Sequence, residues 1–447
     1  MSRSIFSPFA CVIVILFLYC FPVVTNYFDN RIVDSTSISH FVIPAFGQRQ
    51  LSLPQLNDEA LRVEPVIEEE LLFPTSMVFV DNDTLLVTQK NDGNVISIIN
   101  GTVKSQPAIS VEVNNEGFKG LLGIAAMEKP SSSSSHTKFV FLYFTELYGG
   151  DQTRNRVYRY EWNQENQVLV NGTMILDLPA EPESVHNGGK LEADRNGNLY
   201  AVIGDLSRDG QLQNVRHGPV ADDTSVIIRI IQNGSGAADN PFFESSSERM
   251  QKYYAYGIRN SFGLAIDPIS GLLWDTENGP DSYDEMNIVH PGFNSGWNQI
   301  MGPISHSSIE QEDLEEELMI FDGSKYTDPI FSWKDPVGLT DLEFLNSTAL
   351  GLEYAYNLFV GDINNGNLYY FELNHNRTGI ELDDNDLDDL TDQVADDEQE
   401  LSEIVFGSGF KEGITDIETG PDGFLYILTF NGDIYRILPV TDENRQD

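Results

Sequence analysis

A recurring pattern of a turn followed by a strand constrains the fold of this chain more than any other feature. Residues 194–200 read Asp-Arg-Asn-Gly-Asn-Leu-Tyr, and related patterns occur at residues 267–274 and 421–426. In each copy, a turn containing glycine leads into an apolar segment that carries an aromatic residue. Degenerate copies occur at residues 81–86 and 356–362. Repeats separated by several tens of residues are typical of propeller blades, each of which is one small sheet.

The rest of the chain agrees with an all-β fold. Short β-rich runs alternate with Gly, Asn and Asp turns, and no amphipathic helix of convincing length occurs among them. The runs are residues 84–88, 95–99, 139–145, 157–162, 199–203, 226–231, 272–274, 367–373, 424–429 and 433–437. We therefore predict a six-bladed β-propeller of four-stranded antiparallel blades over residues 69–440. Pairing of the first strand with the last is expected to close the ring.

Four segments stand outside this pattern. Residues 1–25 contain a short apolar run behind a basic residue, which indicates a signal peptide or an N-terminal membrane anchor. Residues 26–68 are interpreted as a polar stalk or linker. Acidic insertions near residues 309–318 and 383–403 are interpreted as solvated loops. Within the second, residues 384–389 suggest a calcium loop but lack the glycine that an EF-hand needs at its sixth position.

Charge limits the partners of the protein. The 447 residues include 26 Lys and Arg against 70 Asp and Glu, a formal net charge of −44. Such a surface repels nucleic acid and anionic membranes, so we expect no nucleic-acid partner and membrane contact only through the possible N-terminal anchor.

Cysteine usage and sequons indicate an extracytoplasmic protein. Both cysteines, Cys11 and Cys20, lie in the N-terminal segment, so no disulfide is expected in the folded domain. Six N-x-[ST] sequons agree with a glycoprotein that is secreted or anchored to the outer face of the cell membrane. They begin at Asn82, Asn100, Asn171, Asn233, Asn346 and Asn376.

The first candidate site residues are a histidine and a carboxylate. His186 opens a His-Asn-Gly-Gly turn, and Asp205 follows nineteen positions later, after one strand and one turn. A carboxylate bonded to one ring nitrogen fixes the tautomer and leaves the other nitrogen free to accept a proton. The alternative is structural, with His186 capping a turn and Asp205 forming an Asx-turn.

Two further loops contribute candidate site residues: one carries an arginine, and the other has the pattern of a calcium-binding loop. Arg259 and Asn260 stand between a glycine and a strand, and an arginine there suits a bidentate bond to a carboxylate. The loop after the next strand reads Glu-Asn-Gly-Pro-Asp at residues 277–281, and Gly279 and Pro280 direct carbonyls outward, as a calcium ion requires. Together these groups indicate a site for a multiply anionic ligand.

The ordered set of motifs resembles the soluble pyrroloquinoline-quinone-dependent glucose/sorbosone dehydrogenases, also called aldose sugar dehydrogenases. The resemblance covers residues 70–438 in the family's order. Its motifs are residues 120–125, 186–189, 204–205, 257–260, 277–280, 284–287, 296–297, 332–333 and 420–423. It implies a six-bladed propeller that carries pyrroloquinoline quinone (PQQ) and Ca2+ on one face.

The resemblance also implies residue roles. His186 is expected to be the general base that takes the proton from a sugar's anomeric hydroxyl, and Asp205 is expected to orient it. The expected cofactor-binding residues are Arg259, Asn260, Asn278 and Asp284, and Gly279 and Pro280 are expected to bind the metal. The implied partners are a small-molecule sugar and an external electron acceptor.

Two positions depart from the family pattern. Phe118 stands where the dehydrogenases carry a polar residue. The family often has Arg-x-Arg-Asp before its last Gly-Pro-Asp-Gly, whereas residues 413–416 read Gly-Ile-Thr-Asp. Each ion pair lost in this way costs about 2–5 kcal/mol of affinity for an anionic cofactor unless it is replaced. Lys190 and Lys411 are the candidate replacements.

The sequence therefore favours a quinoprotein dehydrogenase that oxidises aldose sugars or related alcohols by hydride transfer to calcium-bound PQQ. Two alternatives remain open at this stage. One is a calcium-dependent lactonase or esterase, which needs only metal-activated water and a base. The other is a non-catalytic cell-surface propeller that binds sugar or protein. The missing arginines favour the alternatives, whereas the histidine–carboxylate pair and the calcium loop favour an enzyme.

Overall fold

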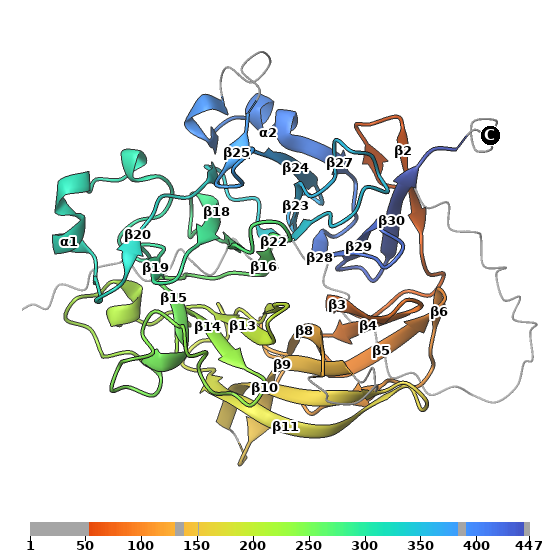
Figure 1. Cartoon of the computed structure of the whole chain (residues 1–447), viewed down its shortest axis with the longest axis horizontal. Coiled ribbons are helices and arrows are strands. Elements are labelled where there is room, and N and C mark those ends of the chain that lie inside the picture. Colours follow the sequence, from red (N-terminus) through yellow and green to blue (C-terminus); the bar gives the residue numbers. More distant parts are fainter. Residues whose placement is uncertain (1–52, 130–137, 151, 383–389, 442–447) are drawn as a thin grey trace, which may run out of the picture. The chain divides into compact units, whose positions relative to one another are not determined.

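The protein is described from a computed structural model that covers residues 53–129, 138–150, 152–382 and 390–441. The N-terminal segment, most of the expected stalk and residues 384–389 lie outside this range. Strands dominate and form six sheets, which lie around a common centre in Figure 1. Among the described residues, no helix has the length and apolarity that a membrane crossing demands.

The first three sheets follow the chain. Sheet one contains β3 (Pro74–Asp81), β4 (Thr84–Gln89), β5 (Asn94–Ile99), β6 (Thr102–Val103) and β7 (Ile109–Ser110). Sheet two contains β8 (Leu121–Glu128), β9 (Lys138–Tyr148), β10 (Gln152–Asn163) and β11 (Val168–Pro179). Sheet three contains β12 (Leu191–Ala193), β13 (Asn198–Ile203), β14 (Val226–Ile231), β15 (Tyr253–Tyr256), β19 (Phe293–Asn294) and β20 (Lys325–Tyr326).

The last three sheets include strands from distant parts of the chain. Sheet four contains β16 (Gly263–Ile266), β17 (Leu273–Glu277), β18 (Asp284–Val289), β21 (Phe331–Trp333) and β26 (Val394–Ala395). Sheet five contains β22 (Leu339–Phe344), β23 (Leu358–Asp362), β24 (Leu368–Leu373), β25 (Ile380–Glu381), β27 (Val405–Ser408) and β1 (Gln55–Leu56). Sheet six contains β28 (Ile414–Thr419), β29 (Leu425–Thr429), β30 (Ile434–Pro439) and β2 (Leu61–Pro65).

The first strands of the sheets form a closed circle of neighbours. β3, β8, β12, β16, β22 and β28 contact one another in chain order, and β28 contacts β3. The all-β propeller prediction is thus confirmed, and each strand-forming run expected from the sequence overlaps an observed strand. In a propeller, each small sheet packs both of its faces against neighbouring sheets, and short strands joined by tight turns suit this packing.

The propeller begins at an earlier residue than the predicted boundary at residue 69. β2 pairs antiparallel with β30, the last strand, so the expected closure between chain ends occurs, but within residues interpreted as a stalk. Leu61 and Val63 are buried while Arg62 between them is partly exposed, which is the alternation of a half-buried strand. β1 likewise pairs with β27.

Several sheets contain more than the four antiparallel strands predicted for each blade. β19 pairs parallel with β15, and β26 pairs parallel with β21. The acidic insertions are also more ordered than the loops expected. Residues 309–318 contain α1 (Leu314–Glu317), and the described part of residues 383–403 contains β26 and most of α2 (Glu398–Ile404). The second insertion returns to a sheet edge, where β26 satisfies backbone groups of β21.

The repeated turns have a common physical basis. Asp194 Oδ1 accepts a hydrogen bond from Asn196 N at 2.8 Å, and Asp267 Oδ1 accepts one from Ile269 N at 3.0 Å. Asp422 Oδ1 accepts one from Phe424 N at 3.2 Å. These are Asx-turns, in which the side chain replaces a backbone acceptor. Each lies between the first and second strands of its sheet.

The sheets have two distinguishable ends. At one end, turns after second strands contact the loops that lead into the first strands of the next sheets. Backbone hydrogen bonds join Leu121 to Lys90, Asp205 to Arg259 and Leu71 to Gly432. We call this end the site face. The other end, which carries the turns after the first and third strands, is the opposite face.

Candidate active site

The turn that carries His186 has a backbone only a few residue types tolerate. His186 has φ 55°, Gly188 has φ 61° and Gly189 has φ 116°. A Cβ on Gly189 would lie 2.5 Å from Leu122 Cβ, so no side chain fits there. The two glycines let the chain turn sharply against β8 and β13, which places the imidazole on the site face.

His186 and Asp205 form the predicted pair. Their Nδ1 and Oδ1 atoms lie 2.6 Å apart, and the two side chains are 18% and 4% exposed. Asp205 Oδ1 also accepts from Ser207 N at 2.8 Å, and Oδ2 accepts from Trp297 Nε1 at 2.6 Å. Because an ionised carboxylate only accepts, neutral His186 carries its proton on Nδ1. Nε2 is then the free, basic nitrogen.

Trp297 joins this pair to the predicted anion-binding arginine. Its indole N–H donates to Asp205, while the Arg259 guanidinium lies 5.3 Å from its ring centre. Trp297 belongs to the Gly-Trp motif at residues 296–297, but the sequence assigned it no role. Trp297 and Asp205 are 92 positions apart in the sequence. The only sequence signal for Trp297 was its place directly after a glycine in the Gly-Trp motif.

Arg259 is a cation without an anionic partner among the described residues. Its Nη1 donates to Asn278 O at 2.7 Å, its Nε is buried without a partner, and no carboxylate lies within ion-pair distance. Burial lowers the pKa of Arg259, and the carboxylates of Asp205 and Asp284 partly offset this effect. A partly buried guanidinium with spare donors is suited to an anionic ligand.

The other predicted cofactor residues shape the loops more than they face an open site. Asn278 Nδ2 donates to Leu339 O at 2.8 Å. Asp284 is fully buried and accepts from Gly279 N at 2.9 Å and Gly338 N at 2.7 Å. Burial raises the pKa of Asp284, although these backbone donors oppose the effect. Asp284 therefore holds the backbone of the predicted calcium loop, and Asn278 joins that loop to β22.

Of the remaining predicted residues, Gly279 and Pro280 are accessible to a ligand, whereas Asn260 is buried, with an oxygen unpartnered in the described part of the chain. Asn260 Oδ1 is buried without a partner among the described residues, and the residue itself is only 6% exposed. Gly279 is partly exposed and Pro280 is exposed. Backbone N–H of Asn278 donates to Asn260 O at 2.8 Å, so the arginine loop and the calcium loop are tied together.

The proposed replacement role of Lys190 is wrong. Its Nζ lies 2.6 Å from Asp341 Oδ2 and 2.6 Å from Asp416 Oδ1, and all three side chains are buried. Burial alone would lower the pKa of Lys190, but the two carboxylates hold it well above its usual value. The side chain leaves the His186 turn toward β22 and β28, so its charge is already used within the protein.

More carboxylates surround this lysine on the first strands of the sheets. Burial, together with the nearby Glu343, raises the pKa of Glu192 to about 8. Burial raises the pKa of Glu343 itself to about 7. Sequence reasoning missed this group because its members come from β12, β22 and β28. Alternating acidic residues at 341 and 343 and at 416 and 418 were the available signal.

A second buried acidic group lies beneath the arginine loop. Glu277 and Glu285 are direct cross-strand partners, as are Asp275 and Asn287. Glu277 Oε2 accepts from Arg259 N at 3.0 Å, which ties this group to the site. Burial raises the pKa of Glu277 to about 7. Sequence reasoning also missed this group, since its residues were interpreted only as parts of motifs.

Glycine occupies the first of the two positions where the family carries an arginine. Gly413 has φ 89°, and a Cβ there would lie 2.3 Å from Ile363 O. The backbone conformation at Gly413 and the close approach of Ile363 therefore leave no room for an arginine side chain. Lys411 in the same loop is exposed. Phe118, the other departure, is 51% exposed, and its N–H donates to Ser184 O at 3.0 Å beside the His186 turn.

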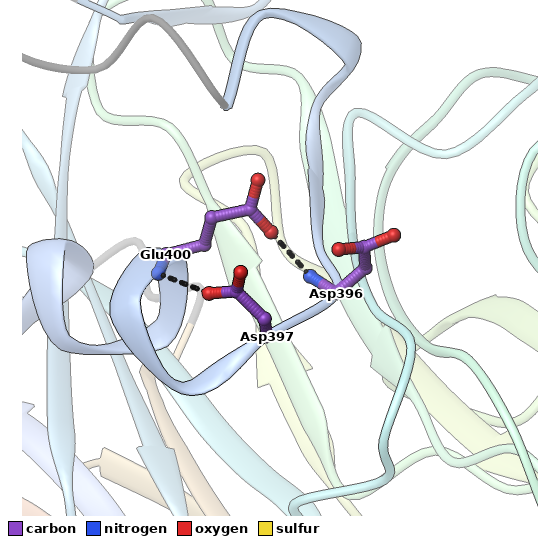
Figure 2. A group of neighbouring side chains, drawn as sticks. All are labelled: Asp396, Asp397 and Glu400. Carbon is purple, nitrogen blue, oxygen red and sulfur yellow. Dashed lines mark hydrogen bonds between the residues drawn. The ribbon is translucent and has the colours of Figure 1, made fainter.

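One acidic trio has the spacing of metal ligands, but its oxygens cap a helix. Oxygen atoms of Asp396, Asp397 and Glu400 lie within 4.8 Å of one another. Figure 2 shows that Asp397 Oδ1 accepts from Glu400 N at 3.0 Å and Glu400 Oε2 accepts from Asp396 N at 2.7 Å. Asp397 is the N-cap of α2, so this geometry is explained without an ion.

Comparison with known proteins identifies relatives of this chain. The sequence model for "Glucose / Sorbosone dehydrogenase" matches residues 71–436. Aldose sugar dehydrogenase YliI of Escherichia coli (strain K12) is 27% identical over 384 residues, 84% of this chain and 92% of that protein. Quinoprotein glucose dehydrogenase B of Acinetobacter calcoaceticus is 26% identical over 259 residues, 53% of this chain and 52% of that protein.

Solved structures show the same fold. The apo-form of the soluble aldose sugar dehydrogenase from Escherichia coli gives a TM-score of 0.64 at 24% identity and covers 85% of this chain and 100% of its own. The PQQ-bound aldose sugar dehydrogenase from Streptomyces coelicolor gives 0.61 at 21% identity, with 87% and 100% covered.

Fold and site together define a β-propeller with a histidine–carboxylate pair beside an arginine that has no anionic partner among the described residues. The chain belongs to the glucose/sorbosone dehydrogenase family. Its homologues named aldose sugar dehydrogenase and glucose dehydrogenase are oxidoreductases, and this chain is a member of that enzyme family.

Proposed function

We propose that this protein is a quinoprotein dehydrogenase that oxidises aldose sugars or related alcohols, with PQQ as hydride acceptor and Ca2+ as its metal. The observation that carries the proposal is the His186–Asp205 pair held through Trp297 beside Arg259. We also infer that the six sheets are six blades of one ring, which the circle of contacts between their first strands supports.

The residues present fit an anionic, planar cofactor on one side of the site. Arg259 Nε and Asn260 Oδ1, on neighbouring residues of one loop, are buried polar atoms without partners among the described residues. Buried polar atoms in native proteins are usually paired, so an unpartnered guanidinium nitrogen next to an unpartnered amide oxygen supports a polar ligand at this loop. Arg259 and Asn260 would hold the cofactor, and the carbonyls of Gly279 and Pro280 would bind Ca2+.

The chemistry of the protein is proton transfer and positioning. PQQ, when bound, supplies a two-electron acceptor for a hydride. His186 Nε2 takes the proton of the sugar hydroxyl, and the Asp205 carboxylate stabilises the resulting imidazolium. The Trp297 and Ser207 donors keep that carboxylate in place. Arg259 supplies positive charge beside the reacting centre.

Steady-state dye reduction tests the proposal. The full chain is incubated with PQQ and Ca2+ and assayed with a panel of aldoses and an artificial electron acceptor. We expect turnover that needs both additions and that falls about 10²–10⁴-fold in His186→Ala, the contribution typical of a general base. No dye reduction with any aldose would refute the proposal.

A hydrolase is the second candidate, and the absence of a basic residue at the family's arginine positions favours it. A lactone assay with Ca2+ alone separates the two. Acid release that requires His186 but not PQQ would support a hydrolase, and sugar oxidation that requires PQQ would exclude it.

We further propose that the protein is exported. Its apolar N-terminal run and its six sequons support this, as does the confinement of both cysteines to the N-terminal segment.

A further inference from the structure

The sequons occupy one end of the propeller. Asn82 lies in the turn between β3 and β4, and Asn233 follows β14, the third strand of its sheet. Asn100 follows β5, Asn346 follows β22 and Asn376 follows β24. Turns after first and third strands all lie on the opposite face, because strands alternate in direction and every first strand starts on the site face.

The sixth sequon agrees with the other five. Asn171 lies four positions after the turn that joins β10 to β11, at an irregularity in the pairing of these strands. That turn follows the third strand of sheet two and is therefore on the opposite face. Asn171 lies near this end of β11, on the outermost strand of the sheet.

Contacts between turns support a shared face for these positions. Asn100 Nδ2 donates to Asp83 Oδ2 at 3.4 Å, which joins two turns of sheet one. Asn346 N donates to Thr419 Oγ1 at 3.4 Å at the end of β28, the first strand of sheet six. Next to Asn376, Arg377 Nε lies 2.5 Å from Asp267 Oδ2 in the turn of sheet four.

Every one of these asparagines is exposed. The exposed residues are Asn82, Asn100, Asn171, Asn233, Asn346 and Asn376. They are spread over sheets one, two, three and five. The site face, by contrast, carries His186, Arg259 and the calcium loop and has no sequon among the described residues.

We propose that the protein carries N-linked glycans on the opposite face alone, at these six asparagines, and that the site face stays free of them. In the reaction, the asparagine amide nitrogen bonds to C1 of an oligosaccharide carried on a polyprenyl diphosphate. The bond from C1 to the diphosphate oxygen breaks, the diphosphate leaves with the electron pair, and the amide releases one proton. The proposal does not depend on the dehydrogenase activity.

The physical consequence is an asymmetric particle. A glycan is bulky and strongly hydrated, so it excludes other macromolecules from the surface around it. The opposite face is then shielded, while a sugar, a cofactor and an electron acceptor reach the site face without hindrance.

Glycan mapping tests the sites. The full chain, placed behind a secretion signal of an N-glycosylating host, is treated with peptide N-glycosidase in heavy-oxygen water and analysed by peptide mass spectrometry. Each occupied asparagine is converted to a labelled aspartate. We expect label at all six sites, and a majority of unlabelled sequons would overturn the proposal.

A protection experiment tests the one-sided arrangement. Glu116→Cys places a thiol on the site face, and Ile269→Cys places one on the opposite face, where Ile269 is 60% exposed. Each variant is bound to a mannose-specific lectin resin and reacted with a large maleimide–polyethylene glycol, with the parent chain as background.

Ile269→Cys is expected to react at least about tenfold more slowly on the resin than after glycan removal, whereas Glu116→Cys reacts at similar rates in both states. Equal protection of both thiols, or protection of Glu116→Cys alone, would refute the one-sided arrangement. Neither readout requires enzyme activity, so failure here is distinguishable from failure of the proposed function.

Discussion

Asp205→Asn is the perturbation that probes the site most closely. Three donors point at the Asp205 carboxylate: His186 Nδ1, Ser207 N and Trp297 Nε1. Asparagine has the same shape but only one acceptor oxygen, so its NH2 group must face at least one of these donors. If the NH2 faces His186, the imidazole accepts at Nδ1 and carries its proton on Nε2, where a base is needed.

The expected magnitude follows from this geometry. The wrong tautomer removes general-base catalysis, which contributes about 10²–10⁴-fold in rate, or about 3–5 kcal/mol of transition-state stabilisation. Losing one or two hydrogen bonds to a buried charge also lowers the free energy of unfolding by about 2–4 kcal/mol. We therefore expect a lower kcat and a lower melting temperature together.

A double-mutant cycle with His186→Ala separates a specific role from general damage. Dye reduction by the PQQ- and Ca2+-treated protein measures kcat for wild type, both single variants and the double variant. Because Asp205 acts through His186, Asp205→Asn should add little to the effect of His186→Ala. Full multiplication of the two effects, or a kcat for Asp205→Asn within about threefold of wild type, would refute the reasoning.

Three further predictions concern neighbouring residues. Trp297→Phe keeps a ring beneath Arg259 but removes the donor to Asp205. We therefore expect kcat to fall about tenfold while the PQQ affinity stays unchanged. A loss of PQQ affinity without a loss of kcat would contradict this role. Burial raises the pKa of Glu192 to about 8 from 4.5. The folded state therefore keeps a proton that the unfolded chain releases, and the free energy of unfolding falls as pH rises between these values. Glu192→Gln should raise the melting temperature at pH 8 more than at pH 5, as differential scanning calorimetry would show. Gly189→Ala should lower the free energy of unfolding by at least about 2 kcal/mol in urea titrations, because φ is 116° and the added Cβ meets Leu122; an unchanged midpoint would contradict this steric clash.

The strands could be predicted from sequence because their signals are local. Asp194 and Asp422 start Asx-turns whose acceptor and donor are two positions apart, so the turn is visible in the residues themselves. β2 was missed because its five residues include a proline and two charged side chains, and only pairing with β30 makes them a strand.

The site could be predicted in part. The His186–Asp205 pair spans one strand and one turn, which sequence spacing can anticipate. Lys190 could not be placed, because its carboxylate partners lie 151 and 226 positions away. The role of Trp297 likewise depends on a contact between distant loops.

Equilibrium binding of PQQ to the Ca2+-loaded apo-protein tests the central claim most directly. The account predicts saturable one-to-one binding by titration calorimetry. It also predicts that Arg259→Ala weakens this binding by about 30-fold or more, since a partly buried guanidinium–carboxylate contact is lost. Absence of binding, or equal affinity in wild type and Arg259→Ala, would contradict the assignment of this face as a quinone site.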